Sequence, residues 1–285
     1  MSIEINNLRY VYNPGMPGET VALNDVSLTI GDGEMVGIIG HTGSGKSTLL
    51  QHMNGLLKPA SGDVFVDGQC ITDGKANLVD IRRKVGLVFQ YPEYQLFEET
   101  VAKDVAFGPR NLGIEGEELD KTIQEAIEIV GLNYNEIQNS SPFELSGGMK
   151  RRVAIAGVIA MRPSVLILDE PTAGLDPTAH REILSMIRRI NDNREIIIIF
   201  VSHNMDDIAN MCSRVVVMDK GKVSLEGTPQ EVFAQGRLLE SMGLDVPPVV
   251  HIMNKISDEV SGFYSSALTI DEAAKDIREY IKRKK

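Results

Sequence analysis

Short apolar runs separated by stretches with helical spacing dominate the chain up to about residue 235. Each run has the length of a strand that is buried on both faces. The runs are residues 35–39, 85–89, 165–168, 196–201 and 215–218. Continuous apolar strands that alternate with helices are typical of a parallel sheet covered on both sides. The pattern therefore predicts an α/β fold with a parallel-sheet core.

Two other patterns adjoin this core. The first 35 residues form short alternating segments with turn signals at residues 13–15 and 31–33, which predicts an antiparallel β subdomain. From residue 92 to about residue 162 helical periodicity takes over, and one apolar stripe ends at Gly131: Leu119, Ile123, Ala126, Ile127 and Val130. This stripe predicts a helical subdomain inserted into the core.

The chain changes character again after Gly236. One apolar stripe at helical spacing follows Pro247 and Pro248, and a second follows a capping box made by Thr269 and Glu272. The stripes are Val249, Ile252, Met253, Ile256 and Val260, and then Ile270, Ala273, Ala274, Ile277 and Ile281. We expect a main domain over residues 1–235 and a small C-terminal domain of two helices over residues 236–285.

A glycine-rich segment lies between the first apolar run and a helical pattern. Residues 40–47 read GHTGSGKS and fit the phosphate-loop pattern G-x-x-x-x-G-K-[ST]. Glycines let the backbone N–H groups approach a polyphosphate closely, and the next helix points its positive end at the same anion. Lys46 is expected to reach the phosphates and Ser47 to bind Mg²⁺, in a P-loop (RecA-like) core. An ordinary glycine-rich turn is the alternative.

Two carboxylates end the run that reads LILDE. Asp169 can hold Mg²⁺ directly or through water. Glu170 is placed to orient and deprotonate an attacking water. Alone, an acidic pair that faces solvent would explain the same residues, but next to a phosphate loop we favour phosphoryl transfer.

A second helix start with anion-binding character lies at Ser146, Gly147 and Gly148, where a serine cap and two glycines open an amphipathic stretch. A single nucleotide cannot be assumed to use both helix starts. We therefore interpret them as facing different nucleotides across a dimer, with a plain capped helix as the alternative. His203 follows the run at residues 196–201 and could hydrogen-bond the transferring group, although a lone histidine is more often structural.

The composition narrows the class of protein. Apolar residues make up 42% and charged residues 24% of the chain, as in globular proteins with a sizeable core. A net charge of −11 leaves no broad basic face for nucleic acid. Cys70 and Cys212 are expected to be reduced thiols. We expect no signal peptide, and the apolar runs fall far below the ~18 residues that span a bilayer, so any membrane role is peripheral.

Taken in order, these segments resemble the ATP-binding cassette (ABC) ATPases over nearly the whole chain. Gln90 matches the Q-loop glutamine, residues 145–148 match the signature motif, residues 174–176 match the D-loop, and His203 matches the switch histidine. The resemblance implies ATP as the nucleotide and Tyr12 as the aromatic side chain that stacks on adenine, with Tyr10 as the less favoured choice. The residues that it assigns to ATP in and after the phosphate loop are Gly40, His41, Thr42, Gly43, Ser44, Gly45, Lys46, Ser47 and Thr48.

The resemblance also implies catalytic roles and a head-to-tail dimer. Glu170, His203 and Gln90 are the implied catalytic residues, and Ser47, Gln90 and Asp169 are the implied Mg²⁺ ligands. The implied dimer has two composite sites, in which the phosphate loop of one subunit closes on the signature residues and the D-loop of the other, represented here by Ser146, Gly147, Gly148 and Asp176. Met149 departs from the family, which usually has glutamine there.

A narrower resemblance is to the energy-coupling-factor (ECF) transporter ATPases, and within them to the second of two ATPase subtypes. Residues 40–59, 85–113 and 141–148 carry it. It implies a peripheral subunit at the cytoplasmic face of the cell membrane that uses ATP to drive uptake of a micronutrient, a vitamin or a metal ion. The implied partners are a second ATPase subunit or a second copy, a membrane-embedded coupling subunit and a substrate-binding S component.

The resemblance further implies where partners bind. Residues 91–97 match the surface that receives the coupling helices, although Tyr91, Tyr94, Leu96 and Phe97 could instead pack the helical insertion. Residues 236–285 resemble a dimer-contact domain. The ATPase of a conventional ABC importer is the alternative function. A soluble ABC protein acting on DNA or ribosomes is disfavoured by the single cassette and the acidic charge, and no residue here is expected to encode the transported substrate.

Overall fold

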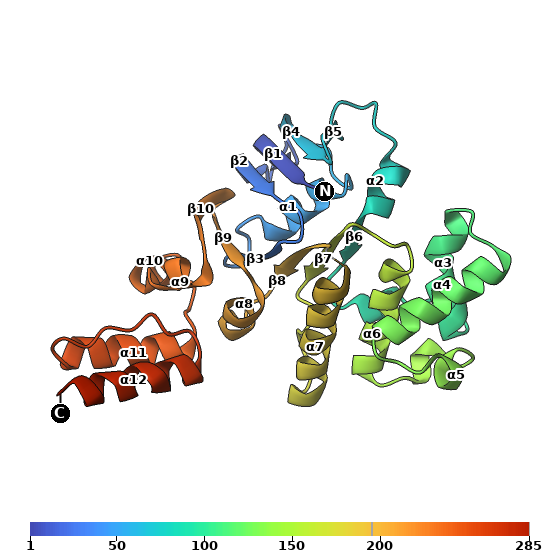
Figure 1. Cartoon of the computed structure of the whole chain (residues 1–285). Helices are drawn as coiled ribbons and strands as arrows, with labels where there is room; N and C mark the ends of the chain where they lie inside the picture. The colour runs from blue at the N-terminus through green and yellow to red at the C-terminus, as the bar shows by residue number, and fades with distance from the viewer. Residues whose placement is uncertain (195, 285) are drawn as a thin grey trace.

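A six-stranded sheet forms the centre of the computed structural model, which describes residues 1–194 and 196–284 (Figure 1). Its strands are β3 (Met35–Ile39), β6 (Val85–Val88), β7 (Val165–Asp169), β8 (Ile197–Val201), β9 (Arg214–Asp219) and β10 (Lys222–Gly227). The order is β10-β9-β3-β8-β7-β6, and all neighbours are parallel except β9 and β10. Every residue of β3, β7 and β8 is buried, which confirms the predicted parallel-sheet core.

The strand boundaries differ slightly from the sequence prediction. Phe89 and Ile196 lie just outside β6 and β8. The antiparallel edge strand β10 was not expected, because its residues alternate in burial and include two charged side chains, Lys222 and Glu226. Such a half-buried edge strand has no continuous apolar run to reveal it.

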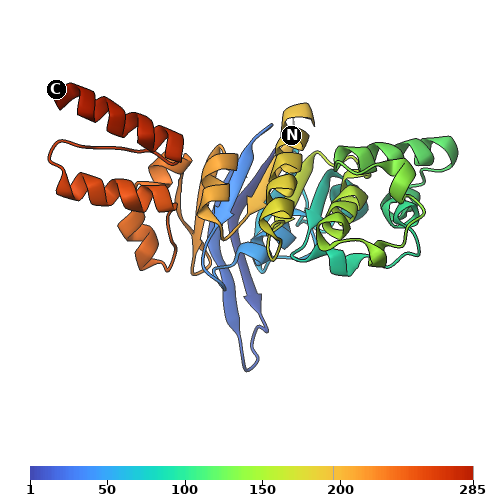
Figure 2. The ribbon, with the colours of Figure 1, turned by 90° about the horizontal axis from the view of Figure 1, so that it is seen from below.

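A second, antiparallel sheet confirms the β subdomain. Its strands are β1 (Ile3–Tyr12), β2 (Thr20–Ile30), β4 (Ser61–Val66) and β5 (Gln69–Cys70), in the order β2-β1-β4-β5. The β1–β2 hairpin protrudes from the body in Figure 2. Helix α1 (Lys46–Met53) contributes Leu49, Leu50 and Met53 to one apolar cluster that also includes residues of both sheets. Helix α2 (Leu78–Lys84) leads into β6.

The inserted segment between β6 and β7 is helical, as its periodicity predicts. It comprises η1 (Pro92–Gln95), α3 (Val101–Asn111), α4 (Gly116–Ile129), α5 (Tyr134–Ile137), η2 (Pro142–Glu144) and α6 (Gly147–Ile159). The whole predicted stripe from Leu119 to Val130 is buried. Gly131 ends α4 with a φ of 76°, a conformation that glycine adopts without steric cost.

Helices α7 (Pro177–Arg194), α8 (Met205–Met211) and α9 (Pro229–Phe233) follow β7, β8 and β10. Together with α6 they bury one large apolar cluster against the six-stranded sheet. The connection from β7 through α7 to β8 places these two strands side by side in parallel. This crossover brings the residues that follow both strands to one edge of the sheet.

The C-terminal segment contains α10 (Gly236–Ser241), α11 (Pro248–Glu259) and α12 (Ile270–Lys284), so the expected helix pair is preceded by a third, short helix. Thr269 and Glu272 form the predicted capping box. Helices α11 and α12 share a small apolar cluster made by Met253, Phe263, Ala267 and Ala273. They lie at the opposite end of the molecule from α3–α6 (Figure 2), and Lys285, the last residue of the expected domain, lies outside the described residues.

Candidate nucleotide-binding site

The phosphate loop lies between β3 and α1, where the GHTGSGKS motif predicts it. Its glycines are required by close packing, because a Cβ atom on Gly40 would lie 2.4 Å from the carbonyl oxygen of Met218. On Gly45, whose φ is 105°, a Cβ atom would lie 2.6 Å from the carbonyl oxygen of Ala22. The loop backbone therefore lies directly against β2 and β9, in a conformation that side chains at these positions would prevent.

Lys46 spans the loop from the first turn of α1. Its Nζ donates hydrogen bonds to the carbonyl oxygens of Gly40 and His41, at 2.5 and 3.1 Å. Burial lowers the pKa of Lys46, and the negative charges of Glu170 and Asp169 oppose that shift. A cation is thus held at the centre of a glycine-rich cradle, as phosphate binding requires.

Ser44 and His41 are two further polar residues of the phosphate loop. The Oγ of Ser44 is fully buried and has no hydrogen-bond partner among the described residues. The His41 imidazole lies between the carbonyl oxygen of Thr42, 2.7 Å from Nδ1, and the carboxylate of Asp219, 3.1 Å from Nε2. Asp219 is the last residue of β9, so this contact attaches the loop to the neighbouring strand.

The two carboxylates of LILDE lie beside the loop. Ser47 Oγ donates to Asp169 Oδ2 at 3.0 Å, which joins the phosphate loop to the end of β7. Asp169 is buried, and its burial raises its pKa, while the Ser47 hydrogen bond and the charges of Lys46 and His203 oppose the shift. A serine hydroxyl and a carboxylate in contact are hard oxygen ligands of the kind that Mg²⁺ prefers.

Glu170, the next residue, contacts both other predicted catalytic side chains. The Nε2 of His203 lies 2.6 Å from Glu170 Oε1, and the Nε2 of Gln90 donates to Glu170 Oε2 at 3.3 Å. Burial raises the pKa of Glu170, an effect that His203 opposes and Asp169 reinforces. The carboxylate is held between two polar side chains and is largely shielded from solvent. The solvent-facing interpretation of the acidic pair is therefore wrong.

The strand order explains this convergence. β3, β8, β7 and β6 are consecutive neighbours in the sheet and run parallel. The phosphate loop follows β3, His203 follows β8, Glu170 follows β7 and Gln90 follows β6. Since the carboxyl ends of parallel strands share one edge, these residues meet where α/β sheets bind their ligands.

Tyr12 and Tyr10, at the end of β1, lie against helix α1. The Tyr12 hydroxyl is 3.1 Å from Oγ1 of Thr48, which lies two residues after Lys46 in the first turn of α1, and the Tyr12 ring is partly exposed. Tyr10 instead packs edge-to-face against His52 and against Tyr12, with ring centroids 4.8 Å apart in both pairs. Tyr12 therefore has the more accessible ring face beside the loop.

The signature residues and the D-loop form a separate cavity of about 360 Å³. Ser146 Oγ accepts a hydrogen bond from the backbone N–H of Met149 at 3.3 Å, as the capped helix start predicts. Asp176 accepts from the backbone N–H groups of Thr178 and Ala179, which lowers its pKa. Among the described residues, none from the phosphate loop lines this cavity.

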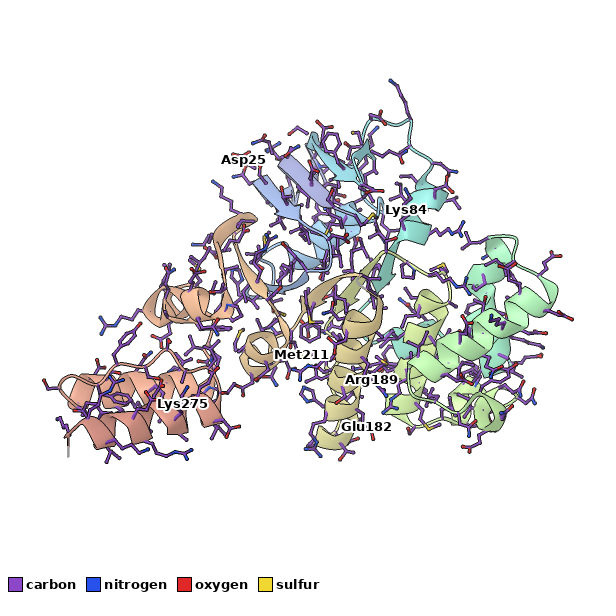
Figure 3. The ribbon with its side chains drawn as sticks, viewed as in Figure 1. Asp25, Lys84, Glu182, Arg189, Met211 and Lys275 are labelled. Atoms are coloured by element: carbon purple, nitrogen blue, oxygen red, sulfur yellow. The ribbon has the colours of Figure 1, made fainter. Side chains whose placement is uncertain are left out.

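The wall of the cavity includes an ion pair between helices α6 and α7. Arg152 donates from Nη2 to Glu182 Oε2, and both residues line the cavity. Figure 3 labels Glu182 and, two turns further along the same helix, Arg189.

The structure thus brings Gln90, Glu170, His203, Asp169 and the phosphate loop together, and it keeps the signature residues apart from them within one chain.

Comparison with known proteins identifies the family of the chain. The family model described as ABC transporter matches residues 23–173. The energy-coupling factor transporter ATP-binding protein EcfA2 of Caldanaerobacter subterraneus subsp. tengcongensis is 54% identical over 282 residues, covering 99% of this chain and 98% of that protein. The chain belongs to the family of energy-coupling factor transporter ATP-binding proteins. It is therefore an ATP-binding protein of the ABC class.

Solved structures support the fold of this ECF ATP-binding protein. The structure of cbiO1 from Clostridium perfringens, described as part of the ABC transporter complex cbiONQ, has a TM-score of 0.75 and 38% identity. It covers 88% of this chain, and 98% of that chain is matched. The ATP-binding cassette MJ0796, a dimer in a post-hydrolysis state bound to ADP and Pi, has a TM-score of 0.71 and 30% identity, with 80% and 98% coverage.

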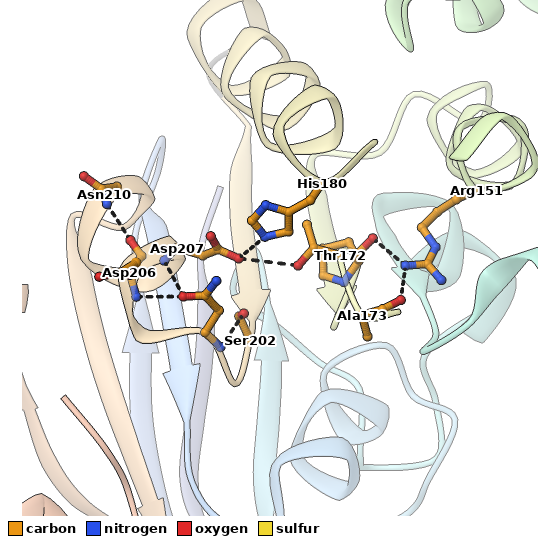
Figure 4. A network of polar contacts seen from close by, with 10 residues as sticks. Arg151, Thr172, Ala173, His180, Ser202, Asp206, Asp207 and Asn210 are labelled. Carbon is orange, nitrogen blue, oxygen red and sulfur yellow. Dashed lines mark hydrogen bonds and ion pairs between the residues drawn. The ribbon is translucent and has the colours of Figure 1, made fainter. Parts of the chain in front are cut away.

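Two polar groups that the sequence did not predict contact the segment after Glu170, and Figure 4 shows Arg151 of one group and all three residues of the other. One is Arg151 with Glu93, and the other joins Thr172, His180 and Asp207. A signal for Arg151 was available, because helical spacing places it four residues before Ile155 on the buried face of α6. The second group has no such signal, since its members come from separate segments.

Proposed function

We propose that this ECF ATP-binding protein hydrolyses ATP with Mg²⁺ and that hydrolysis drives uptake of a micronutrient, a vitamin or a metal ion, through membrane partner subunits. The observation that carries the proposal is the convergence of Lys46, Ser47, Asp169, Glu170 and His203 at one sheet edge, with Gln90 in contact with Glu170. A phosphate cradle, a hard oxygen pair and a carboxylate base are the parts that phosphoryl transfer to water needs.

The residues of the loop fit a nucleotide polyphosphate and its metal ion. Gly40 and Gly45 allow the loop backbone to pack against β9 and β2, and the buried Ser44 hydroxyl is available as a donor. In this proposal Lys46 binds the β- and γ-phosphates, while Ser47, Asp169 and Gln90 hold Mg²⁺. When it is bound, the Mg²⁺ ion would neutralise negative charge that develops on the phosphates.

Glu170 acts as the general base in this mechanism. Its carboxylate accepts a proton from the attacking water, which Gln90 helps to orient, and general-base assistance of this kind contributes about 10²- to 10⁴-fold in rate. The raised pKa of Glu170 makes the carboxylate a stronger base than a solvated glutamate. His203, 2.6 Å from the carboxylate, fixes its orientation and can donate a hydrogen bond to the transferring phosphoryl group.

A head-to-tail dimer completes each site in the proposal. Ser146, Gly147 and Gly148 present a capped helix start toward a cavity that lacks phosphate-loop residues in the described part of the chain, so their nucleotide belongs to a neighbouring subunit. Asp176 lies at the same cavity and takes part in that contact. Tyr12 stacks on adenine in the chain's own site. The neighbour is a second ECF-type ATPase subunit or a second copy of this chain.

An apolar groove between α2, α3 and α6 supports contact with a membrane-embedded coupling subunit. The cavity measures about 370 Å³ and includes Leu96, Phe97 and Phe107 in its wall. Phe97 is 56% exposed and packs edge-to-face on Phe107, with centroids 5.0 Å apart. Asp104 accepts hydrogen bonds from the backbone N–H groups of Phe97 and Glu98, which holds the phenyl ring at the groove.

The predicted docking segment is therefore mostly exposed rather than packed into the insertion. Tyr91, Tyr94 and Phe97 are exposed, whereas Leu96 and Pro92 are buried. We place this groove against the coupling helices of the membrane partner, with a substrate-binding S component in the same assembly. None of the helices in residues 1–194 and 196–284 combines the length and apolar character needed to cross a bilayer.

The proposal places the chain at the cytoplasmic face of the cell membrane, as a peripheral subunit. Residues 1–235 form the ABC ATPase domain, whose helical subdomain covers about residues 92–162, and residues 236–285 form a dimer-contact domain. Exposed Ile252 on α11, Ile270 on α12 and Tyr264 in the connection between these helices provide apolar surface for that contact. The net charge of −11 argues against nucleic acid as a partner.

Glu170→Gln tests the proposal in the assembled transporter complex. The amide cannot accept the proton, so steady-state ATP hydrolysis should fall about 10²- to 10⁴-fold. Binding of ADP, measured by titration calorimetry, should be retained because Lys46 and the loop are intact. Unchanged turnover in the variant would sink the assignment of Glu170 and, with it, the proposed mechanism.

A further inference from the structure

Arg151 is the largest fully buried side chain among the described residues, with 1% of its surface exposed. It lies on α6, little more than one turn after the signature glycines. A guanidinium remains charged at any physiological pH, and burying an unpaired charge is strongly unfavourable. The partners of Arg151 therefore have to be present for α6 to pack as it does.

Those partners come from the two loops that carry Gln90 and Glu170. Nε and Nη2 donate to both carboxylate oxygens of Glu93, at 3.1 and 2.7 Å, in the bidentate geometry of strong arginine–carboxylate pairs. Nη1 donates to the backbone carbonyl oxygens of Pro171 and Ala173, at 3.0 and 2.7 Å (Figure 4). The Tyr91 ring centroid is 5.9 Å from the guanidinium carbon.

The hydrogen bonds from Arg151 to the backbone of Pro171 and Ala173 matter because Glu170 lies directly before this segment. Pro171 directly follows Glu170, whose φ of 52° lies in the left-handed region, which is sterically unfavourable for residues other than glycine. A conformation of this kind persists only when the surroundings determine it. Arg151 holds the loop from one side, and on the other side Thr172 Oγ1 donates to Asp207 at 3.4 Å.

We propose that Arg151 is a positioning residue for ATP hydrolysis. Its guanidinium is bonded to Glu93 and to the carbonyl oxygens of Pro171 and Ala173, and it acts by fixing the loop after Glu170 relative to the loop after Gln90. The base and the water-orienting amide are thereby kept in one arrangement. This inference rests on the proposed hydrolytic function and adds a residue to it.

Arg151→Lys in the assembled complex is the first test. Lysine keeps the charge but lacks the planar fork, so it cannot bind Glu93 and both carbonyl oxygens together. Misplacement of a catalytic group by about 1 Å can cost about 10²-fold. We expect kcat to fall about 10- to 100-fold, with KM and the Kd for ADP within about twofold of wild type.

The matched control is Arg162→Lys, the same replacement in the same helical subdomain. Arg162 pairs with Glu125 at 3.2 Å, and both side chains are exposed. Its kcat should be unchanged.

A double variant separates positioning from stability. Replacing both buried partners, Arg151→Met with Glu93→Met, removes the charges as a pair, which is often neutral for stability. We expect its melting temperature to recover toward wild type while kcat stays low, because the carbonyl oxygens of Pro171 and Ala173 lack their donor. Recovery of kcat together with the melting temperature would overturn the inference.

Two other results would also overturn it: wild-type kcat in Arg151→Lys, or loss of ADP affinity in proportion to the loss of kcat. The outcome for Glu170→Gln keeps the two proposals distinguishable. If Glu170→Gln leaves turnover unchanged, the proposed function fails. If it abolishes turnover while Arg151→Lys does not reduce it, only the role of Arg151 fails.

Discussion

Replacing His180 by alanine removes the main donor to a buried carboxylate. His180 lies on the first turn of α7, and its Nε2 is 2.8 Å from Oδ2 of Asp207, at the start of α8 (Figure 4). Asp207 is 4% exposed, and burial raises its pKa while the His180 hydrogen bond opposes that shift. In the variant, Thr172 is the other side-chain donor to Asp207 within the described part of the chain, at the longer distance of 3.4 Å.

The magnitude follows from this geometry. A hydrogen bond to a charged group contributes about 1.5–3 kcal/mol. Because the His180 side chain is 24% exposed, water can partly replace it, and we take about 2 kcal/mol as the loss in the free energy of unfolding. The entropy of unfolding for a chain of this length is about 0.6 kcal/mol/K, so the melting temperature should fall by about 3 °C.

Differential scanning calorimetry of the full chain measures this change. Arg181→Ala is the control, since Arg181 is exposed and its hydrogen bond to Thr178 is long, at 3.4 Å. It should shift the melting temperature by less than about 1 °C. Adding Asp207→Asn to His180→Ala should restore most of the loss, because an amide leaves no buried charge. A His180→Ala melting temperature equal to wild type, or no recovery in the double variant, would refute the reasoning.

Gly45→Ala should abolish detectable ADP binding in titration calorimetry, because its Cβ would lie 2.6 Å from the Ala22 carbonyl oxygen at a φ of 105°; wild-type affinity would contradict this. Burial raises the pKa of Glu170 above its ordinary value of 4.5, and a base must be ionised, so kcat should be lost as pH falls through a pKa above 4.5. A kcat–pH profile that stays flat down to pH 4.5 would oppose this assignment. Phe97→Ser should lower co-purification with the membrane partners about tenfold without changing ADP affinity, and undiminished recovery would exclude the groove as their docking surface.

The local motifs could be identified from the sequence because each consists of residues that are close together along the chain. The phosphate loop needs its glycines, lysine and serine at fixed spacing between a strand and a helix, and the structure has β3 and α1 at those places. The serine cap at Ser146 and the capping box at Thr269 are also short-range hydrogen bonds. Periodicity in the same way predicted the buried stripe of α4 and the strands of the parallel sheet.

Which segments meet was decided by the tertiary structure. Gln90 and Glu170 are 80 residues apart, and Arg151 and Glu93 are 58 apart, yet both pairs are in contact. An apolar pattern predicts that a face is buried, but it does not predict which element covers that face. For this reason the sequence did not predict the strand order β9-β3-β8-β7-β6 or the contact between His180 and Asp207. The sequence by itself determined the chemical groups and the fold class, because both depend on neighbours along the chain. Packing alone placed Glu170 between Gln90 and His203 and set the signature serine at a different cavity, since those positions depend on how distant strands and helices bury one another.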